Sequence, residues 1–354
     1  MAEERNRLFS VQYMRGWAAT LVVFAHTFEH PLSEPNHAFL VSGRYGVEVF
    51  FVISGFIITC SVKGRQFSPV EFMLRRIARV VPLYWLVTLL VALLCVVLPT
   101  LFKTTSVTTS HLLQSLFFIP HADPRDITEW SPLHKPGWTL IYEMFFYSLM
   151  AVLFWCSSLK SRVVTLTAII GGLTAYGLTL PDRLSPLGYL TDLQLLPFLF
   201  GVWIGGLFLS RRHWFAQPAV PVGAGLAFLA FTAIVYVPSL NPLGDFAMTI
   251  ASLSLLALAI SMEERRTFPR IPLFKEIGDS SYSLYLWHMF VVGLGWTVLG
   301  KLFGTTGVAY ALIGCLIVML SIIGSHVAFL IVEKPMTAWL QDAIRPRSKP
   351  AIVA

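Results

Sequence analysis

Charged residues are scarce in this sequence. Asp, Glu, Lys and Arg make up 13% of its 354 residues, whereas a soluble domain usually carries about 25%. Hydrophobic residues account for 56% of the chain. This composition excludes an ordinary soluble domain and predicts an all-α, polytopic bundle of transmembrane helices.

Cysteine is also rare, and no internal repeat is evident. The four cysteines lie in predicted helices without metal or redox spacing, so we expect small buried hydrophobes and no metal site. The lack of a repeat disfavours the inverted-repeat architecture of many secondary transporters. No small-residue cleavage site follows the first apolar segment, which argues against a cleavable signal. We expect one transmembrane domain over 1–340 and a basic cytoplasmic tail over 341–354.

About ten apolar segments are long enough to cross a bilayer. The predicted spans are 9–29, 45–62, 80–100, 138–157, 163–180, 192–210, 219–237, 244–262, 281–300 and 308–332. The EKP sequence at 333–335 is expected to stop the last helix at the cytoplasmic surface. An interfacial helix is expected after it.

The Lys and Arg residues predict the orientation. With the N-terminus in the cytoplasm, nineteen of the 26 lie in cytoplasmic segments, six lie outside, and Arg15 lies within the membrane. Both termini are therefore expected in the cytoplasm. The net charge of +7 then follows from topology and indicates membrane lipids, not nucleic acid, as partners.

The first span carries two ionisable side chains, Arg15 and His26. Such groups are costly in hydrocarbon, about 2.5–3.5 kcal/mol for Arg, and they mark function by default. Eleven residues turn a helix through about 1100°, close to three full turns, so both side chains share one face about 16 Å apart along the axis. The alternative is that each side chain snorkels to its own membrane surface. The shared face favours a functional stripe.

Two carboxylates are predicted to reach the depth of His26. Glu48 lies near the external end of the second span, and Glu143 about a turn and a half into the fourth. A carboxylate beside an imidazole fixes its tautomer and raises its basicity. Ser54 and Trp138 are candidate substrate-binding residues, although small residues also serve helix packing and Trp also serves the aromatic belt.

An arginine cluster precedes the third span, at Arg75, Arg76 and Arg79. A helix brings at least two of these side chains together, and forked guanidinium donors suit phosphate oxygens. Positive-inside anchoring explains the same residues without any ligand.

A second polar cluster lies in the cytoplasmic half of the ninth span. It consists of Tyr282, Ser283, Tyr285 and His288, of which the two tyrosines and the histidine are candidate binding residues. Polar contact between helices is the competing explanation for these side chains.

Together these residues resemble the acyltransferase 3 family of integral-membrane acyltransferases, and within it the exopolysaccharide acetyltransferases. The resemblance covers about 8 to 340 and depends on five stretches in the same order. They are the first-span arginine and histidine, FF-x-x-SGF at 50–56, RR-x-x-R at 75–79 with Pro82 and Tyr84, W-T-L-x-x-E-x-x-F-Y at 138–147, and S-Y-x-x-Y-x-x-H at 281–288. The C-terminal hydrolase-like domain of some members is missing, so we expect the membrane domain or a partner to complete the transfer.

The resemblance implies transfer of an acyl group, usually acetyl, from cytoplasmic acyl-CoA to a hydroxyl of a cell-surface or exported glycan or its lipid-linked precursor, in a bacterial inner membrane. The arginine cluster and the ninth-span cluster would hold acyl-CoA. His26 would be the general base, oriented by Glu143 or Glu48. Arg15, Ser54 or a tyrosine would stabilise the tetrahedral intermediate. An acyl-histidine intermediate is the alternative route.

Two other functions fit part of this pattern. Intramembrane Arg, His and Glu also mark ion or substrate paths, so a transporter or flippase for a lipid-linked sugar or an acyl group is the main alternative. A non-catalytic scaffold gives no reason for the stripe of Arg15 and His26. We expect acceptor selectivity in the external loop 101–137, because of its position and length.

Overall fold

The computed structural model describes residues 8–32, 34–62, 68–99, 106–237 and 241–344. Within these ranges the regular elements are all helices, and no strand occurs. In the described part of the chain, eight helices are long and apolar enough to cross a membrane, by length and composition. The predicted all-α polytopic bundle is therefore confirmed, whereas the number of spans and the orientation stay predictions. Most of the expected basic tail, 345–354, lies outside the described residues.

In the described part of the chain, each of the ten expected spans corresponds to one long helix. These are α1 (Phe9–Glu29), α2 (His37–Ser61), α3 (Pro69–Val97), α5 (Trp138–Val152), α6 (Leu159–Thr179), α8 (Leu196–Phe215), α9 (Ala219–Val235), α10 (Asn241–Glu264), α12 (Ser281–Gly295) and α14 (Gly307–Ala328). The shorter α-helices are α4 (Thr109–Leu116), α7 (Pro186–Leu190), α11 (Pro272–Asp279), α13 (Lys301–Phe303) and α15 (Lys334–Ile344).

Two of the ten long helices, α1 and α9, are not among the eight of membrane length and hydropathy. α9 is apolar but has only 17 residues. α1 has 21 residues, and Gln12, Arg15 and His26 interrupt its apolar sequence. The same polar residues that suggest function therefore make α1 a poor helix for lipid.

α2 and α3 begin earlier than the apolar pattern predicts, at His37 instead of 45 and at Pro69 instead of 80. The side chains of Asn36 and Ser68 cap these starts by accepting backbone N–H groups of the first turn. Because the caps set the boundaries, the arginine cluster at 75–79 lies inside α3.

The predicted helix stop at 333–335 is wrong. α14 continues through a π-helical turn, Phe329–Glu333, directly into α15. A π turn widens the helix locally and often occurs at functional positions. Pro335 follows in the first turn of α15, where the missing N–H of a proline is tolerated.

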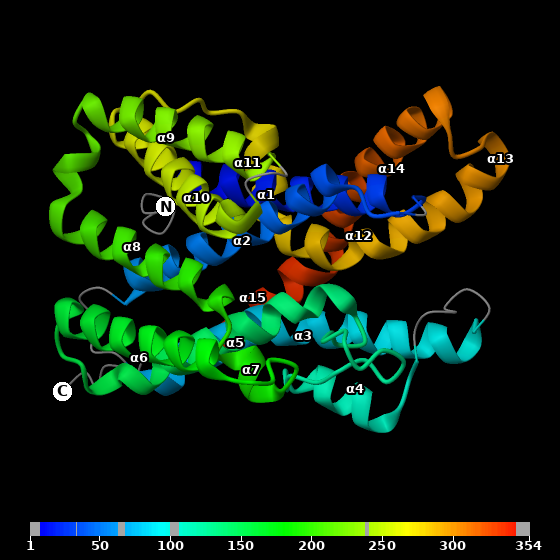
Figure 1. The fold of residues 1–354 in the computed structure, drawn as a ribbon, viewed down its shortest axis with the longest axis horizontal. Helices are drawn as coiled ribbons and strands as arrows, with labels where there is room; N and C mark the ends of the chain where they lie inside the picture. The colour runs from blue at the N-terminus through cyan, green and yellow to red at the C-terminus, as the bar shows by residue number, and fades with distance from the viewer. Residues whose placement is uncertain (1–7, 33, 63–67, 100–105, 238–240, 345–354) are drawn as a thin grey trace, which may run out of the picture.

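Figure 1 shows the helices in two layers. One layer contains α3, α5 and α6 with the short α4 and α7, and the other contains α1, α2, α9, α10, α12 and α14. α8 contacts both α2 and α6, and α12 and α15 contact α3, so these helices join the layers. The candidate site is lined by residues of both layers.

The start of α1 is held by a carboxylate from α10. Glu263 accepts hydrogen bonds from the N–H groups of Phe9 and Ser10, both at 2.9 Å, and from the Ser10 hydroxyl at 2.5 Å. A helix start leaves such N–H groups unpaired, and negative charge is favourable there. This contact fixes the position of α1 along the bundle, and with it the positions of Arg15 and His26.

Two glycines allow α2 and α8 to pack closely. A Cβ atom added at Gly55 would lie 2.0 Å from the carbonyl oxygen of Phe198, and one added at Gly201 would lie 2.1 Å from that of Val52. Real Cβ atoms do not approach oxygen so closely, so this approach of the two backbones requires glycine.

Gly201→Ala is expected to lower the melting temperature of the purified protein by a few degrees, because the methyl group must push α2 and α8 apart. Gly223→Ala in α9 is the matched control, since nothing lies within 4 Å of its added Cβ. Alanine favours a helix over glycine, so the control should hold or raise the melting temperature. Equal melting temperatures for the two variants would contradict the close packing.

Candidate active site

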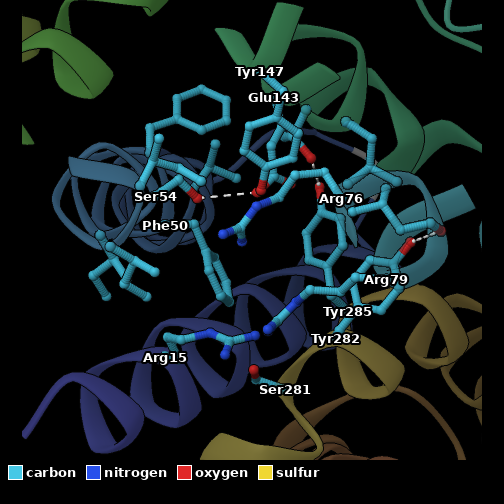
Figure 2. Close-up of a pocket in the computed structure, with 18 residues that line it drawn as sticks. Arg15, Phe50, Ser54, Arg76, Arg79, Glu143, Tyr147, Ser281, Tyr282 and Tyr285 are labelled. Carbon is cyan, nitrogen blue, oxygen red and sulfur yellow. Dashed lines mark hydrogen bonds between the residues drawn. The ribbon is translucent and has the colours of Figure 1, made fainter. Parts of the chain in front are cut away.

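A cavity lies between the two layers, with walls from α1, α2, α3, α5 and α12 (Figure 2). Its volume of about 790 Å³ includes space that is open to the surroundings. Its polar lining consists of Arg15, Ser54, Arg76, Arg79, Thr139, Glu143, Tyr147, Ser281, Tyr282 and Tyr285. Seven of the twelve site residues predicted from the sequence are among these, although they come from five helices.

Three guanidinium groups line the cavity. Figure 2 shows Arg15 reaching in from α1, and Arg76 and Arg79 from α3. Arg75 does not line it: this side chain is exposed, and its Nη2 lies 2.5 Å from Oε1 of Glu71 one turn earlier in α3. The fold therefore separates Arg75 from the other two arginines of the predicted cluster. It brings Arg15 of α1 into the same cavity wall as Arg76 and Arg79.

Glu143 supplies the carboxylate of the cavity wall. Its Oε1 accepts hydrogen bonds from the hydroxyls of Ser54, at 3.1 Å, and of Tyr147. The guanidinium of Arg76 lies over the ring of the same tyrosine, 5.6 Å from its centroid. These contacts hold the carboxylate in place, and three arginines against one glutamate leave the wall positively charged.

Tyr282 and Tyr285 line the cavity from α12 and tie that helix to the other layer. The Tyr282 hydroxyl donates to the carbonyl of Val80 in α3 at 2.7 Å, and the Tyr285 hydroxyl donates to the carbonyl of Pro136 at 2.8 Å. The Thr139 hydroxyl lies 2.8 Å from that of Tyr285. Polar contact between helices therefore accounts for both hydroxyls, while the side chains also form cavity wall.

Glu333, in the π turn after α14, anchors α12 beside the cavity. The residue is buried, and its Oε2 accepts hydrogen bonds from the N–H of Ser283 at 3.1 Å and from its hydroxyl at 2.6 Å. Its charge interacts with those of Arg79 and Arg15. Sequence analysis missed this residue because EKP resembles a helix end. The available signal was a carboxylate directly after an apolar run.

His26 lies against His288 of α12. Its Nδ1 is 3.0 Å from the carbonyl oxygen of Val22 and 3.4 Å from Nε2 of His288. His288 is fully buried, whereas His26 is exposed. The predicted stripe along α1 thus runs from the arginine-lined cavity to a pair of imidazoles.

A row of rings connects the cavity to this pair. Phe50 and Tyr285 line the cavity with ring centroids 6.0 Å apart. The ring of Tyr285 lies 6.1 Å from that of His288, which lies 5.1 Å from that of His26. Ring contacts therefore link the cavity wall to the imidazole pair.

Comparison with known proteins assigns the chain to a family. A family model described as an acyltransferase domain matches residues 8–327. The chain belongs to the acyltransferase 3 family. This confirms the resemblance found in the sequence.

Relatives of this acyltransferase 3 protein cover most of its length. The exopolysaccharide production protein ExoZ of Rhizobium meliloti is 33% identical over 75% of this chain and 81% of that protein. The acyltransferase MdmB of Streptomyces mycarofaciens is 27% identical over 83% and 81%. The peptidoglycan O-acetyltransferase OatA of Listeria monocytogenes is 25% identical over 83% of this chain and 51% of that longer protein. No solved structure matches the chain at comparable significance.

Glu48 and Trp138 lie outside the cavity wall of this acyltransferase 3 protein. Glu48 is buried and accepts a hydrogen bond from the Thr249 hydroxyl in α10. Among the described residues, neither Glu48 nor Glu143 is hydrogen-bonded to His26, as either was expected to be. Trp138 packs edge-on in an aromatic cluster. The catalytic role of Glu48 and the substrate-binding role of Trp138 stay predictions.

The described part of the loop between α3 and α5, which was predicted to be external, packs against α3. The Tyr84 hydroxyl donates to the carbonyl of Ser115 at 3.1 Å, and Trp85 Nε1 donates to that of Leu116 at 2.7 Å, which fixes α4. Just before α5, burial lowers the pKa of His134 to about 4, so this imidazole stays neutral at physiological pH. Acceptor selectivity in the loop stays a prediction.

No group of three or more His, Cys, Asp and Glu residues in the described ranges is arranged to hold a metal ion. Among the described residues, no disulfide joins any of the four cysteines. Cys156 is buried as expected, whereas Cys315 is exposed.

Proposed function

We propose that this protein is a membrane-bound O-acyltransferase that moves an acyl group, preferably acetyl, from cytoplasmic acyl-CoA to a hydroxyl of a cell-surface or exported glycan or its lipid-linked precursor, in a bacterial inner membrane. The observation that carries the proposal is one helix, α1, with Arg15 in a cationic cavity and His26 at an exposed position. The family supplies the reaction class. A peptidoglycan O-acetyltransferase and an exopolysaccharide production protein among the relatives support a glycan acceptor.

The cavity suits the negative charge of acyl-CoA, which resides on its phosphates. Guanidinium groups grip phosphate oxygens with two donors at once. Like charges that converge in a site of low dielectric repel one another, and a phosphate among Arg15, Arg76 and Arg79 replaces that repulsion with attraction. The acyl-pantetheine arm then extends past Phe50 toward His26, about 16 Å further along α1.

His26 acts as the general base of the transfer. Its Nδ1 donates to the Val22 carbonyl, so the Nε2 lone pair is free to accept a proton. Nε2 takes the proton of the acceptor hydroxyl while the hydroxyl oxygen attacks the thioester carbon, which gives a tetrahedral intermediate. The C–S bond then breaks, the ester is released, and the proton passes from His26 to the departing thiolate.

Release of free thiol from acetyl-CoA by the purified protein tests this function, with a crude cell-envelope glycan fraction as acceptor. We expect release by the wild type that depends on the acceptor and disappears in His26→Ala. No release by folded wild-type protein, together with flux of radiolabelled acetyl groups across vesicles, would indicate a transporter instead.

Glu143→Gln is expected to slow turnover by about 10-fold, because a neutral amide holds the hydroxyls of Ser54 and Tyr147 less firmly than the carboxylate does, and Ser54 or a tyrosine is proposed to stabilise the tetrahedral intermediate. The KM for acyl-CoA should stay the same or fall. The amide keeps the shape of the carboxylate, but without its charge the cavity attracts a polyanion more strongly. Steady-state kinetics of thiol release separate the two effects.

Glu71→Gln is the matched control for Glu143→Gln, because Glu71 lies outside the cavity wall. Glu71→Gln should change neither the turnover nor the KM for acyl-CoA. Unchanged turnover in Glu143→Gln would remove Glu143 from the mechanism.

A further inference from the structure

We propose that His288 is the positioning residue of His26 and takes the place of the carboxylate that commonly orients a histidine base. The inference rests on the proposed acyl transfer and gives His288 a role other than the acyl-CoA binding predicted from the sequence. His288 does not line the arginine-rich cavity. It lies instead against His26, at the other end of the stripe on α1.

The hydrogen bonds fix which nitrogen of each ring carries the proton. Nδ1 of His288 lies 3.2 Å from the carbonyl oxygen of Leu284, one turn earlier in α12. A carbonyl accepts only, so Nδ1 is the donor and Nε2 of a neutral His288 carries a lone pair. That lone pair faces Nδ1 of His26 at 3.4 Å.

Nδ1 of His26 therefore has two acceptors for its single proton, the Val22 carbonyl at 3.0 Å and His288 Nε2. One backbone and one side-chain acceptor from different helices hold the ring more firmly than the carbonyl alone. The proton stays on Nδ1, and Nε2 stays available as the base.

The hydrogen bond between His26 and His288 becomes stronger during the reaction. When Nε2 of His26 takes the hydroxyl proton, the ring becomes a cation, and its Nδ1–H bond to His288 becomes charge-assisted. Such bonds are roughly twice as strong as neutral ones. Because this gain appears only as the proton moves, it lowers the barrier and leaves donor binding unchanged.

A neutral partner suits this place in the bundle. His288 is fully buried, and an ionised carboxylate at such a depth is costly unless it is paired. An imidazole accepts the same proton without carrying a charge in the resting protein. The two carboxylates predicted for this role are engaged elsewhere, Glu48 with Thr249 and Glu143 with Ser54.

The test compares two amides at position 288 by thiol release from acetyl-CoA. In His288→Gln the amide oxygen reaches the place of Nε2 and can accept from His26, whereas in His288→Asn it reaches only the place of Nδ1. We expect His288→Gln to keep most of the wild-type kcat and His288→Asn to lose about 10- to 100-fold, as for one hydrogen bond to a charged group. The KM for acetyl-CoA should be unchanged in both.

Two controls separate positioning from a structural effect. His326→Asn in α14 removes a different helix histidine, one that is half-buried, and should leave kcat unchanged. In a His26→Ala background, His288→Asn should cause no further loss, because its effect passes through His26. Melting temperatures confirm that each variant is folded.

Three results would overturn the inference: wild-type kcat in His288→Asn, equal loss in the Asn and Gln variants, or losses at positions 26 and 288 that multiply. Each of them leaves the proposed function standing if the wild type releases thiol and His26→Ala does not. Folded wild-type protein without thiol release would count against the proposed function itself.

Discussion

His26→Ala is expected to lower kcat by about 10²- to 10⁴-fold, the range that a positioned general base contributes. Alanine removes the nitrogen that takes the hydroxyl proton. Binding of acyl-CoA should be unchanged, because Arg15 and the α3 arginines stay in the cavity wall. Thiol release measures kcat, and calorimetric titration of the purified protein with acyl-CoA measures binding.

His30→Ala is the matched control for His26→Ala. His30 follows α1 immediately, is exposed, and lies outside the cavity wall, so its loss should leave kcat as it is. Wild-type turnover in His26→Ala would disprove the base assignment. Acetylated His26, found by mass spectrometry after incubation with donor alone, would favour the covalent route over direct transfer.

Arg79→Ala and Arg76→Ala are each expected to raise the KM for acyl-CoA by about 10- to 100-fold, with a smaller change in kcat. Hydrogen bonds to charged groups contribute about 1.5–3 kcal/mol, and about 1.4 kcal/mol corresponds to tenfold. The wild-type KM should also rise with salt, which screens charge attraction. Initial rates of thiol release at several concentrations of acetyl-CoA measure both effects.

Arg75→Ala distinguishes the structure from the sequence pattern. The pattern assigns Arg75 to phosphate binding, whereas the fold pairs it with Glu71 outside the cavity wall. A KM like that of the wild type in Arg75→Ala supports phosphate binding in the cavity. A rise in KM equal to that of Arg79→Ala would mean that phosphates bind at the protein surface.

Hydrophobic runs predicted the long helices because each run must be about as long as a bilayer is thick. They could not predict where α2 and α3 begin, since Asn36 and Ser68 set those starts by capping. Hydrophobic runs also could not predict that the helix continues through 333–335. A proline after a carboxylate resembles a helix end, yet the chain continues from α14 through the π turn into α15.

Much of the candidate site could be predicted because a charged group in an apolar helix is rarely without a role. Sequence gives the depth of such a residue but not the direction it faces among the packed helices. Arg75 and Arg76 are adjacent in sequence, yet only Arg76 lines the cavity. For the same reason Glu48 could not be matched with Thr249, nor His288 with His26, since both partners depend on distant helices.

The polarity of α1 has a consequence for the order of assembly. α1 is made first, but its neighbours include α10, α11, α12 and α14, which are made last. A lone helix with Arg15 and His26 is poorly held by lipid, so α1 gains its full stability in the bilayer only after synthesis of α14. Truncation before α12 should therefore weaken the membrane insertion of α1, although α2 still packs against it.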